Sequence, residues 1–168
     1  MKLNSTIEKN FFFKIPVILF CLIPFFLITG PFLSDLAISL ISLIFILYCF
    51  KNKNFSYFKN KYFYFFLFFW IYLCFNSLIN NFNLDSIKIS FFYIRYGIFV
   101  IAIITFLDFE DRFIKYFLYC LFFCFIVLII DGFYQYLIGE NIFGFKTPNP
   151  ERISSFFHEE MILGSYLS

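Results

Sequence analysis

Long apolar runs are the feature that most constrains how this chain can fold. A helix needs about 20 mostly apolar residues to cross the hydrocarbon core of a bilayer, and the sequence offers such runs along most of its length. Only 14% of the 168 residues are charged, whereas soluble domains carry roughly 25%. The sequence therefore predicts an all-α fold: a polytopic transmembrane helix bundle with five spanning helices and the start of a sixth.

The expected spans follow from where the apolar runs begin and end. A turn at Thr29-Gly30-Pro31 separates the first two runs, and Gly139 ends the last of them. We expect spanning helices at about 12–28, 32–50, 62–79, 89–107 and 113–138, an outward loop at 139–160 and a truncated helix from 161. Since that helix is too short to span before Ser168, we interpret residues 1–168 as a single N-terminal portion of a longer membrane domain.

Basic residues predict the orientation of the chain. Lys and Arg concentrate on the cytoplasmic side of membrane proteins, and with five spans most of the 13 basic residues fall on one side. That side holds the N-terminal tail and the loops after the second and fourth spans, with Lys2, Lys9, Lys14, Lys51, Lys53, Lys59, Lys61, Arg112 and Lys115. The opposite side holds Lys88, Lys146 and Arg152. We therefore expect a cytoplasmic N-terminus.

Composition also argues against several partners. The net charge of +2 gives no reason to expect nucleic acid. The five cysteines lie inside apolar runs, where they behave as small hydrophobic residues. A single histidine makes a zinc site improbable. We expect the lipid bilayer as a partner and no metal or cofactor, and the sequence does not reveal an oligomeric state.

Three polar residues interrupt the expected spans: Arg95, Asp131 and Gln135. A charge at mid-bilayer costs at least about 2.5–3.5 kcal/mol, so each needs a reason. At about 1.5 Å per residue, Arg95 and Asp131 lie roughly 9 and 10 Å from the outer ends of their helices. We hypothesise that they pair or line one polar cavity open to the outside, with Gln135 one turn above Asp131. Alternatively, Arg95 reaches the headgroups along its long stem.

The densest polar cluster comes at the end of the chain, in RISSFFHEEMILGSYLS from Arg152 to Ser168. The guanidinium of Arg152 suits phosphate or carboxylate, and His158, Glu159 and Glu160 can titrate or accept protons. We expect Phe156 and Phe157 to dip into the outer headgroup layer. An outward Arg beside lipid suits an anionic lipid-linked substrate. The competing interpretation is a solvated helix start, where the helix dipole alone favours Glu.

The stretch from Asp131 to Ser168 resembles the middle of the O-antigen ligase and O-antigen polymerase family of polytopic membrane glycosyltransferases. Members often show an Asp and a Gln late in a helix, two spaced glycines, Arg-Ile-Ser/Thr-Gly-x-Phe, an acidic pair and Gly-Ser-Tyr. The matching residues here are Asp131, Gln135, Gly139, Gly144, Arg152-Ile153-Ser154, Phe157, Glu159-Glu160 and Gly164-Ser165-Tyr166. Ser155 departs from the pattern because it stands where the family usually has Gly, and His158 replaces a small residue.

The resemblance implies an activity and a substrate. Family members transfer a polyprenyl-diphosphate-linked glycan to a lipid or glycan acceptor at the outer face of the bacterial inner membrane, in cell-surface polysaccharide biosynthesis. It implies that Arg152 contacts the diphosphate or orders the loop, and that Glu160 fixes Arg152 or the helix start. The catalytic residue stays unassigned. By itself this portion is expected to be inactive.

Two other classes of protein remain open at this stage. A polysaccharide flippase or other transporter would use Arg95 and Asp131 as charges along its pathway. A small structural membrane protein would end at Ser168, which the unfinished last helix argues against. Neither alternative accounts for the polar cluster of the outer loop.

Overall fold

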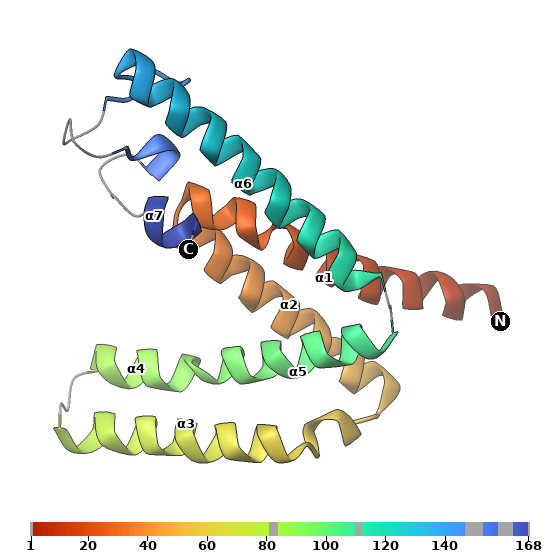
Figure 1. Cartoon of the computed structure of the whole chain (residues 1–168). Helices are drawn as coiled ribbons and strands as arrows, with labels where there is room; N and C mark the ends of the chain where they lie inside the picture. The colour runs from red at the N-terminus through yellow and green to blue at the C-terminus, as the bar shows by residue number, and fades with distance from the viewer. Residues whose placement is uncertain (1, 81–83, 110–111, 147–152, 158–162, 168) are drawn as a thin grey trace. The chain divides into compact units, whose positions relative to one another are not determined.

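The computed structural model of the chain describes residues 2–80, 84–109, 112–146, 153–157 and 163–167 (Figure 1). Regular structure in these ranges is helical, apart from an isolated antiparallel bridge between Glu140 and Lys146. The prediction of an all-α fold is therefore confirmed.

The long helices follow the apolar runs. They are α1 (Lys2–Thr29), α2 (Pro31–Asn52), α3 (Lys61–Asn80), α4 (Leu84–Phe92), α5 (Ile94–Phe109) and α6 (Phe113–Ile138). Short elements complete the described chain: the 3₁₀ turns η1 (Ser56–Phe58) and η2 (Ser155–Phe157), and α7 (Leu163–Leu167). Helix α1 begins ten residues before the expected span, because a helix can continue past the apolar residues that mark a membrane crossing.

Four stretches are long and apolar enough to cross a membrane: Pro31–Asn52, Lys61–Ile79, Leu84–Asp108 and Phe113–Ile138. They match the second to fifth spans predicted from the sequence. The described apolar part of α1, Lys14–Thr29, is shorter. Large apolar side chains on these helices are exposed, among them Phe65 and Phe68 at 75% each. Such surfaces suit contact with lipid chains.

The turn between α1 and α2 occurs at the predicted position. Gly30 adopts a φ of +128°, and its N–H donates to the carbonyl of Phe26 at 3.2 Å. A glycine with positive φ commonly follows the last residue of a helix. Pro31 then begins α2, where its missing N–H costs nothing.

The fourth predicted span is a continuous apolar segment but not a continuous helix. It breaks at Tyr93, between α4 and α5. The indole Nε1 of Trp70 donates to the carbonyls of Ser90 and Phe91, at 3.1 and 3.2 Å. A side chain that enters the ladder of backbone hydrogen bonds is a known cause of helix breaks. The predicted span at 89–107 lies within the candidate span Leu84–Asp108, but the break at Tyr93 was not foreseen, because sequence periodicity does not reveal a contact from another helix.

The described chain forms two compact units. The first unit comprises Met1–Phe20 and Leu36–Phe113. Within it, α3 lies antiparallel beside α4 and α5 (Figure 1). Gly97 permits close approach: a Cβ there would lie 2.2 Å from the Cε1 atom of Phe66. Phe45 is fully buried, and its ring meets the ring of Phe106 edge-on at 6.0 Å.

The second unit comprises Cys21–Asp35 and Ile114–Ser168. The Tyr166 hydroxyl on α7 donates to the carbonyl of Pro24 on α1 at 2.6 Å. The Tyr166 ring lies 5.5 Å from that of Phe157, which is only 7% exposed. The expectation that Phe157 dips into the headgroup layer was therefore wrong, since its ring packs inside this unit. These contacts hold η2 and α7 beside the end of α1.

Candidate functional site

The C-terminal half of α6 carries two buried polar side chains. Asp131 is 0% exposed and Gln135, one turn later, is 2% exposed. Both therefore point away from lipid, as the sequence predicted for Asp131. Their partners come from the segment that follows α6, which folds back against the helix. The candidate site is this polar network, made of Asp131, Gln135, Asn141 and Ser155.

Asp131 binds the loop through both carboxylate oxygens. Its Oδ1 accepts a hydrogen bond from the backbone N–H of Ile142 at 2.9 Å, and its Oδ2 accepts one from the hydroxyl of Ser155. Hydrogen bonds to an ionised group are roughly twice as strong as neutral ones. A buried charge also needs such partners to offset its lost hydration. Asp131 thus ties two separate parts of the loop to α6.

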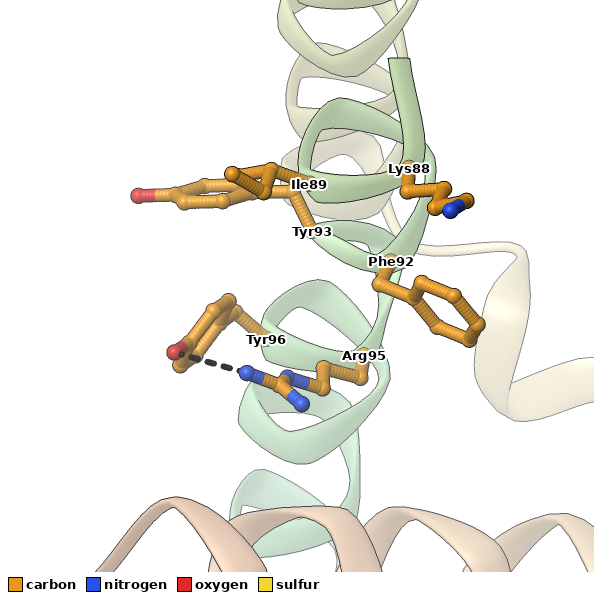
Figure 2. A pocket seen from close by; sticks show the side chains of 6 residues that line it. All are labelled: Lys88, Ile89, Phe92, Tyr93, Arg95 and Tyr96. Atoms are coloured by element: carbon orange, nitrogen blue, oxygen red, sulfur yellow. Dashed lines mark hydrogen bonds between the residues drawn. The ribbon is translucent and has the colours of Figure 1, made fainter. Parts of the chain in front are cut away.

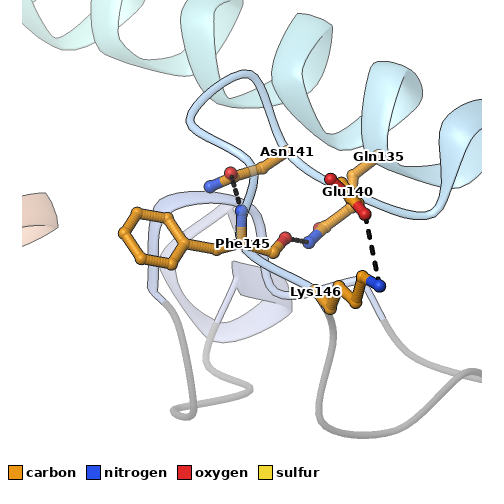
Figure 3. Close-up of polar contacts among 5 residues, drawn as sticks. All are labelled: Gln135, Glu140, Asn141, Phe145 and Lys146. Carbon is orange, nitrogen blue, oxygen red and sulfur yellow. Dashed lines mark hydrogen bonds and ion pairs between the residues drawn. The ribbon is translucent and has the colours of Figure 1, made fainter.

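Gln135 uses both ends of its amide. The Oε1 atom accepts from the backbone N–H groups of Ser154 and Ser155, at 3.2 and 2.7 Å. The Nε2 atom donates to the carbonyl of Phe145 at 3.3 Å (Figure 3). The side chain therefore bridges two segments of the loop. An apolar residue of similar size would leave the backbone groups of Phe145, Ser154 and Ser155 without these hydrogen bonds.

Asn141 is a member of this network that the sequence interpretation missed. Its Oδ1 accepts from the N–H groups of Phe143 and Phe145, at 3.1 and 2.8 Å, and its Nδ2 donates to the carbonyl of Ser155 at 3.1 Å. The bond to Phe143 is an Asx turn, the local structure that Asn favours in loops. Asn141 stands two residues after Gly139, and that spacing could have identified it.

In the described part of the loop, three residues have backbone conformations that side chains rarely adopt. Gly139 and Gly144 have φ of +88° and +84°, and Ser155 has φ of +50°. A left-handed conformation costs a non-glycine residue about 1–2 kcal/mol. At Ser155 the N–H, the carbonyl and the hydroxyl all make hydrogen bonds, to Gln135, Asn141 and Asp131 respectively. Those bonds offset the backbone strain.

An ion pair joins two residues at the surface of the loop. Lys146 Nζ lies 3.4 Å from Glu140 Oε1, and the two residues also form the antiparallel bridge (Figure 3). The Lys146 side chain is largely exposed and that of Glu140 is partly exposed, so the pair contributes about 0–1 kcal/mol. The buried amide and carboxylate contacts, rather than this pair, fix the shape of the loop.

Arg95 lies in the first unit, at the start of α5. Its Nη1 donates to Ser39 Oγ and its Nη2 to the Tyr96 hydroxyl, both at 3.3 Å. Its backbone carbonyl accepts from the Ser42 hydroxyl at 2.9 Å. Asp131 belongs to the second unit, so the predicted pairing of these two charges stays a prediction. The other predicted site residues, Arg152, His158 and Glu160, lie outside the described residues.

The network is suited to holding a loop in one shape rather than to transferring a proton. Asp131 and Gln135 are closed off by their own partners, so neither lines an open cavity in the described structure. What the network can do is hold the described segment 153–157 in a fixed register against α6. A functional group in that segment would thereby be positioned without help from a ligand.

The chain is a multi-pass helical membrane protein. This class follows from the four long apolar segments, the exposed apolar side chains that suit contact with lipid, and the burial of the polar network. Comparisons with protein-family models, with curated proteins and with solved structures found no significant match.

Proposed function

We propose that this chain is part of an O-antigen ligase- or polymerase-like membrane protein, and that the whole protein transfers a polyprenyl-diphosphate-linked glycan to a lipid or glycan acceptor in cell-surface polysaccharide biosynthesis. The observation that carries the proposal is the contact of Asp131 and Gln135 with Ser155. All three positions belong to the resemblance described above, and they are joined by hydrogen bonds although 24 positions separate Asp131 from Ser155.

The backbone at Ser155 gives further support. The family pattern has glycine there, and glycine is the residue that adopts a left-handed backbone without strain. In this chain the position has φ of +50°. Gly139 and Gly144, the spaced glycines of the pattern, also have positive φ. A physical requirement for glycine thus exists at the positions where the pattern contains it.

On this proposal, the network fixes residues 153–157, and Arg152 and Glu160 stand on either side of that segment in the sequence. Arg152 neutralises the diphosphate or orders the loop, an electrostatic contribution to catalysis. Glu160 fixes Arg152 or the helix start. The resemblance implies no metal or nucleotide at the outer face, and arginine side chains would neutralise the charge of the diphosphate leaving group.

The proposed location is the bacterial inner membrane with a cytoplasmic N-terminus. The distribution of basic residues supports this orientation. In this orientation the loop from Gly139 onward would lie at the outer face, where the protein would meet a lipid-linked glycan after the glycan's translocation.

A polysaccharide flippase or other transporter is the second candidate. Arg95 favours it, because a partly buried guanidinium inside an apolar span is typical of a substrate pathway. The loop network gives no support to this alternative, since its charges are closed off.

Deletion of the gene in its own host separates the two functions. A transferase defect should make the lipid-linked glycan accumulate at the outer face, where added glycosidases reach it in spheroplasts. A flippase defect should make it accumulate inside, protected from them. Complementation with the Arg152→Lys and Glu160→Gln variants then tests the proposed roles. Absence of any lipid-linked intermediate in the deletion strain would exclude both functions.

A further inference from the structure

A second polar feature lies in the first unit, at the break between α4 and α5. A cavity of about 350 Å³ opens there, lined by Lys88, Ile89, Phe92, Tyr93, Arg95 and Tyr96 (Figure 2). The two basic residues stand on either side of the break at Tyr93, Lys88 on α4 and Arg95 on α5. All six residues belong to the segment Leu84–Asp108, one of the candidate membrane spans.

The inner wall of the cavity is built around the guanidinium of Arg95. Hydrogen bonds to Ser39 Oγ and to the Tyr96 hydroxyl fix its position, and its Cζ atom lies 5.1 Å from the centre of the Tyr96 ring. Its charge acts in surroundings of low dielectric constant, where an anion is attracted more strongly than in water. The positive charge is thus held in place rather than carried on a mobile side chain.

Lys88 is the second basic residue that lines the cavity. Its Nζ atom lies 3.5 Å from Asp85 Oδ1, but both side chains are mostly exposed, at 67% and 79%. Such a surface pair is worth about 0–1 kcal/mol and yields readily to a better anion. Ile89 and Phe92 beside it are 70% and 62% exposed. In a spanning segment these apolar side chains are suited to contact acyl chains.

We propose that this cavity binds the phosphate group of a membrane lipid, between the ammonium of Lys88 and the guanidinium of Arg95. Lys88 provides a cation at one end of the cavity, and Arg95 provides a fixed guanidinium at the other. With the apolar side chains beside them, they fit a headgroup that enters sideways from the bilayer. The proposal concerns a site in the first unit and is independent of the transferase function, which rests on the loop after α6.

Trp70 provides the reporter, because it is the only tryptophan of the chain and its indole donates to Ser90 and Phe91 beside the cavity wall. The full chain is reconstituted in nanodiscs that contain either brominated phosphatidylglycerol or brominated phosphatidylcholine at equal bromine content. We expect the anionic lipid to bind the site at least about fivefold more tightly than phosphatidylcholine, because one basic residue near the membrane surface provides a preference of this size.

Three variants make the test specific. Lys88→Gln should lower the preference about fivefold, and Asp85→Asn, which removes the competing carboxylate, should raise it. Lys61→Gln, which removes an equal charge at the far end of α3, should leave it unchanged. The side chains of Lys88 and Asp85 are both mostly exposed, so we expect these variants to keep the fold.

Inorganic phosphate distinguishes the two sources of this chemistry. If a lipid is the natural ligand, inorganic phosphate at millimolar concentration should not displace it, because phosphate alone makes only a weak contact with the two charges. Displacement would instead assign the cavity to free phosphate. Equal quenching by both lipids, or a preference that Lys88→Gln leaves intact, would overturn the site.

Discussion

The hydroxyl of Ser155 donates a hydrogen bond to Oδ2 of Asp131, and both residues are 0% exposed. The contact joins the C-terminal half of α6 to the loop that follows it. Because Ser155 also has a left-handed backbone, the position combines a conformational cost with a stabilising contact. The balance between them can be measured.

Substitution of Ser155 should distinguish strain from hydrogen bonding. Ser155→Ala keeps the strain and loses the bond to a carboxylate, a loss of about 1.5–3 kcal/mol. Ser155→Gly loses the same bond but removes a strain of about 1–2 kcal/mol. We therefore expect the glycine variant to be the more stable of the two by about 1 kcal/mol, measured by denaturant unfolding in detergent micelles.

The neighbouring residue provides the control for this comparison. Ser154 has no positive φ, so glycine there should be less stable than alanine, by about 0.4–1 kcal/mol. If alanine and glycine rank the same way at positions 154 and 155, the left-handed backbone at Ser155 does not exist in solution.

Substitution of Gln135 by Glu should make the stability depend on pH. The introduced carboxylate can still accept from Ser154 and Ser155, but it faces the carbonyl of Phe145, where Gln135 donates. An unmet buried group of this kind costs about 1–3 kcal/mol. Burial raises the pKa of the introduced carboxyl, and its protonated form can donate to Phe145.

The Gln135→Glu variant should therefore regain stability as the pH falls through the raised pKa, whereas the wild type should show no such gain. Tyr136→Phe, a change at an exposed neighbour, serves as the control. A variant whose unfolding midpoint follows that of the wild type at every pH would contradict the bond between Gln135 and Phe145.

The contact of Gly97 with Phe66 predicts intolerance to a methyl group. Gly97→Ala would place a Cβ 2.2 Å from the Phe66 ring, which forces α3 and α5 apart or the ring out of place. Overpacking of this kind costs about 1–3 kcal/mol. Thermal unfolding followed by circular dichroism should show the loss, and the double variant with Phe66→Leu should recover most of it.

Gly164 supplies the matched glycine for that experiment. It lies in a helix, and a Cβ there meets nothing within 4 Å. Gly164→Ala should therefore be neutral or slightly stabilising. A loss at Gly97 that Phe66→Leu does not relieve would mean that the two helices do not meet at this residue.

Trp70 should be needed for the break at Tyr93. Trp70→Phe keeps the aromatic ring but removes the N–H that bonds to Ser90 and Phe91, so we expect a loss of about 1 kcal/mol in unfolding free energy. Hydrogen exchange near Tyr93 should change in the same variant. Phe68→Leu, an exposed change on the same helix, should have neither effect.

The sequence alone determined the helical class, the position of four long spans and the turn at Gly30. Each depends on local properties: the length of an apolar run, or a glycine and a proline next to each other. It also identified Asp131 and Gln135 as residues that lipid cannot surround, because a polar group inside an apolar run has few alternatives to burial.

Only the tertiary structure decided where those polar groups are satisfied. Asp131 bonds to Ile142 and Ser155, and the break at Tyr93 depends on an indole from α3. Neither contact has a periodic signature, because residues far apart in the sequence meet only after the chain has folded back. Asn141 was missed for a related reason: its Asx turn is local, but its burial and its bond to Ser155 depend on how the whole loop closes over α6.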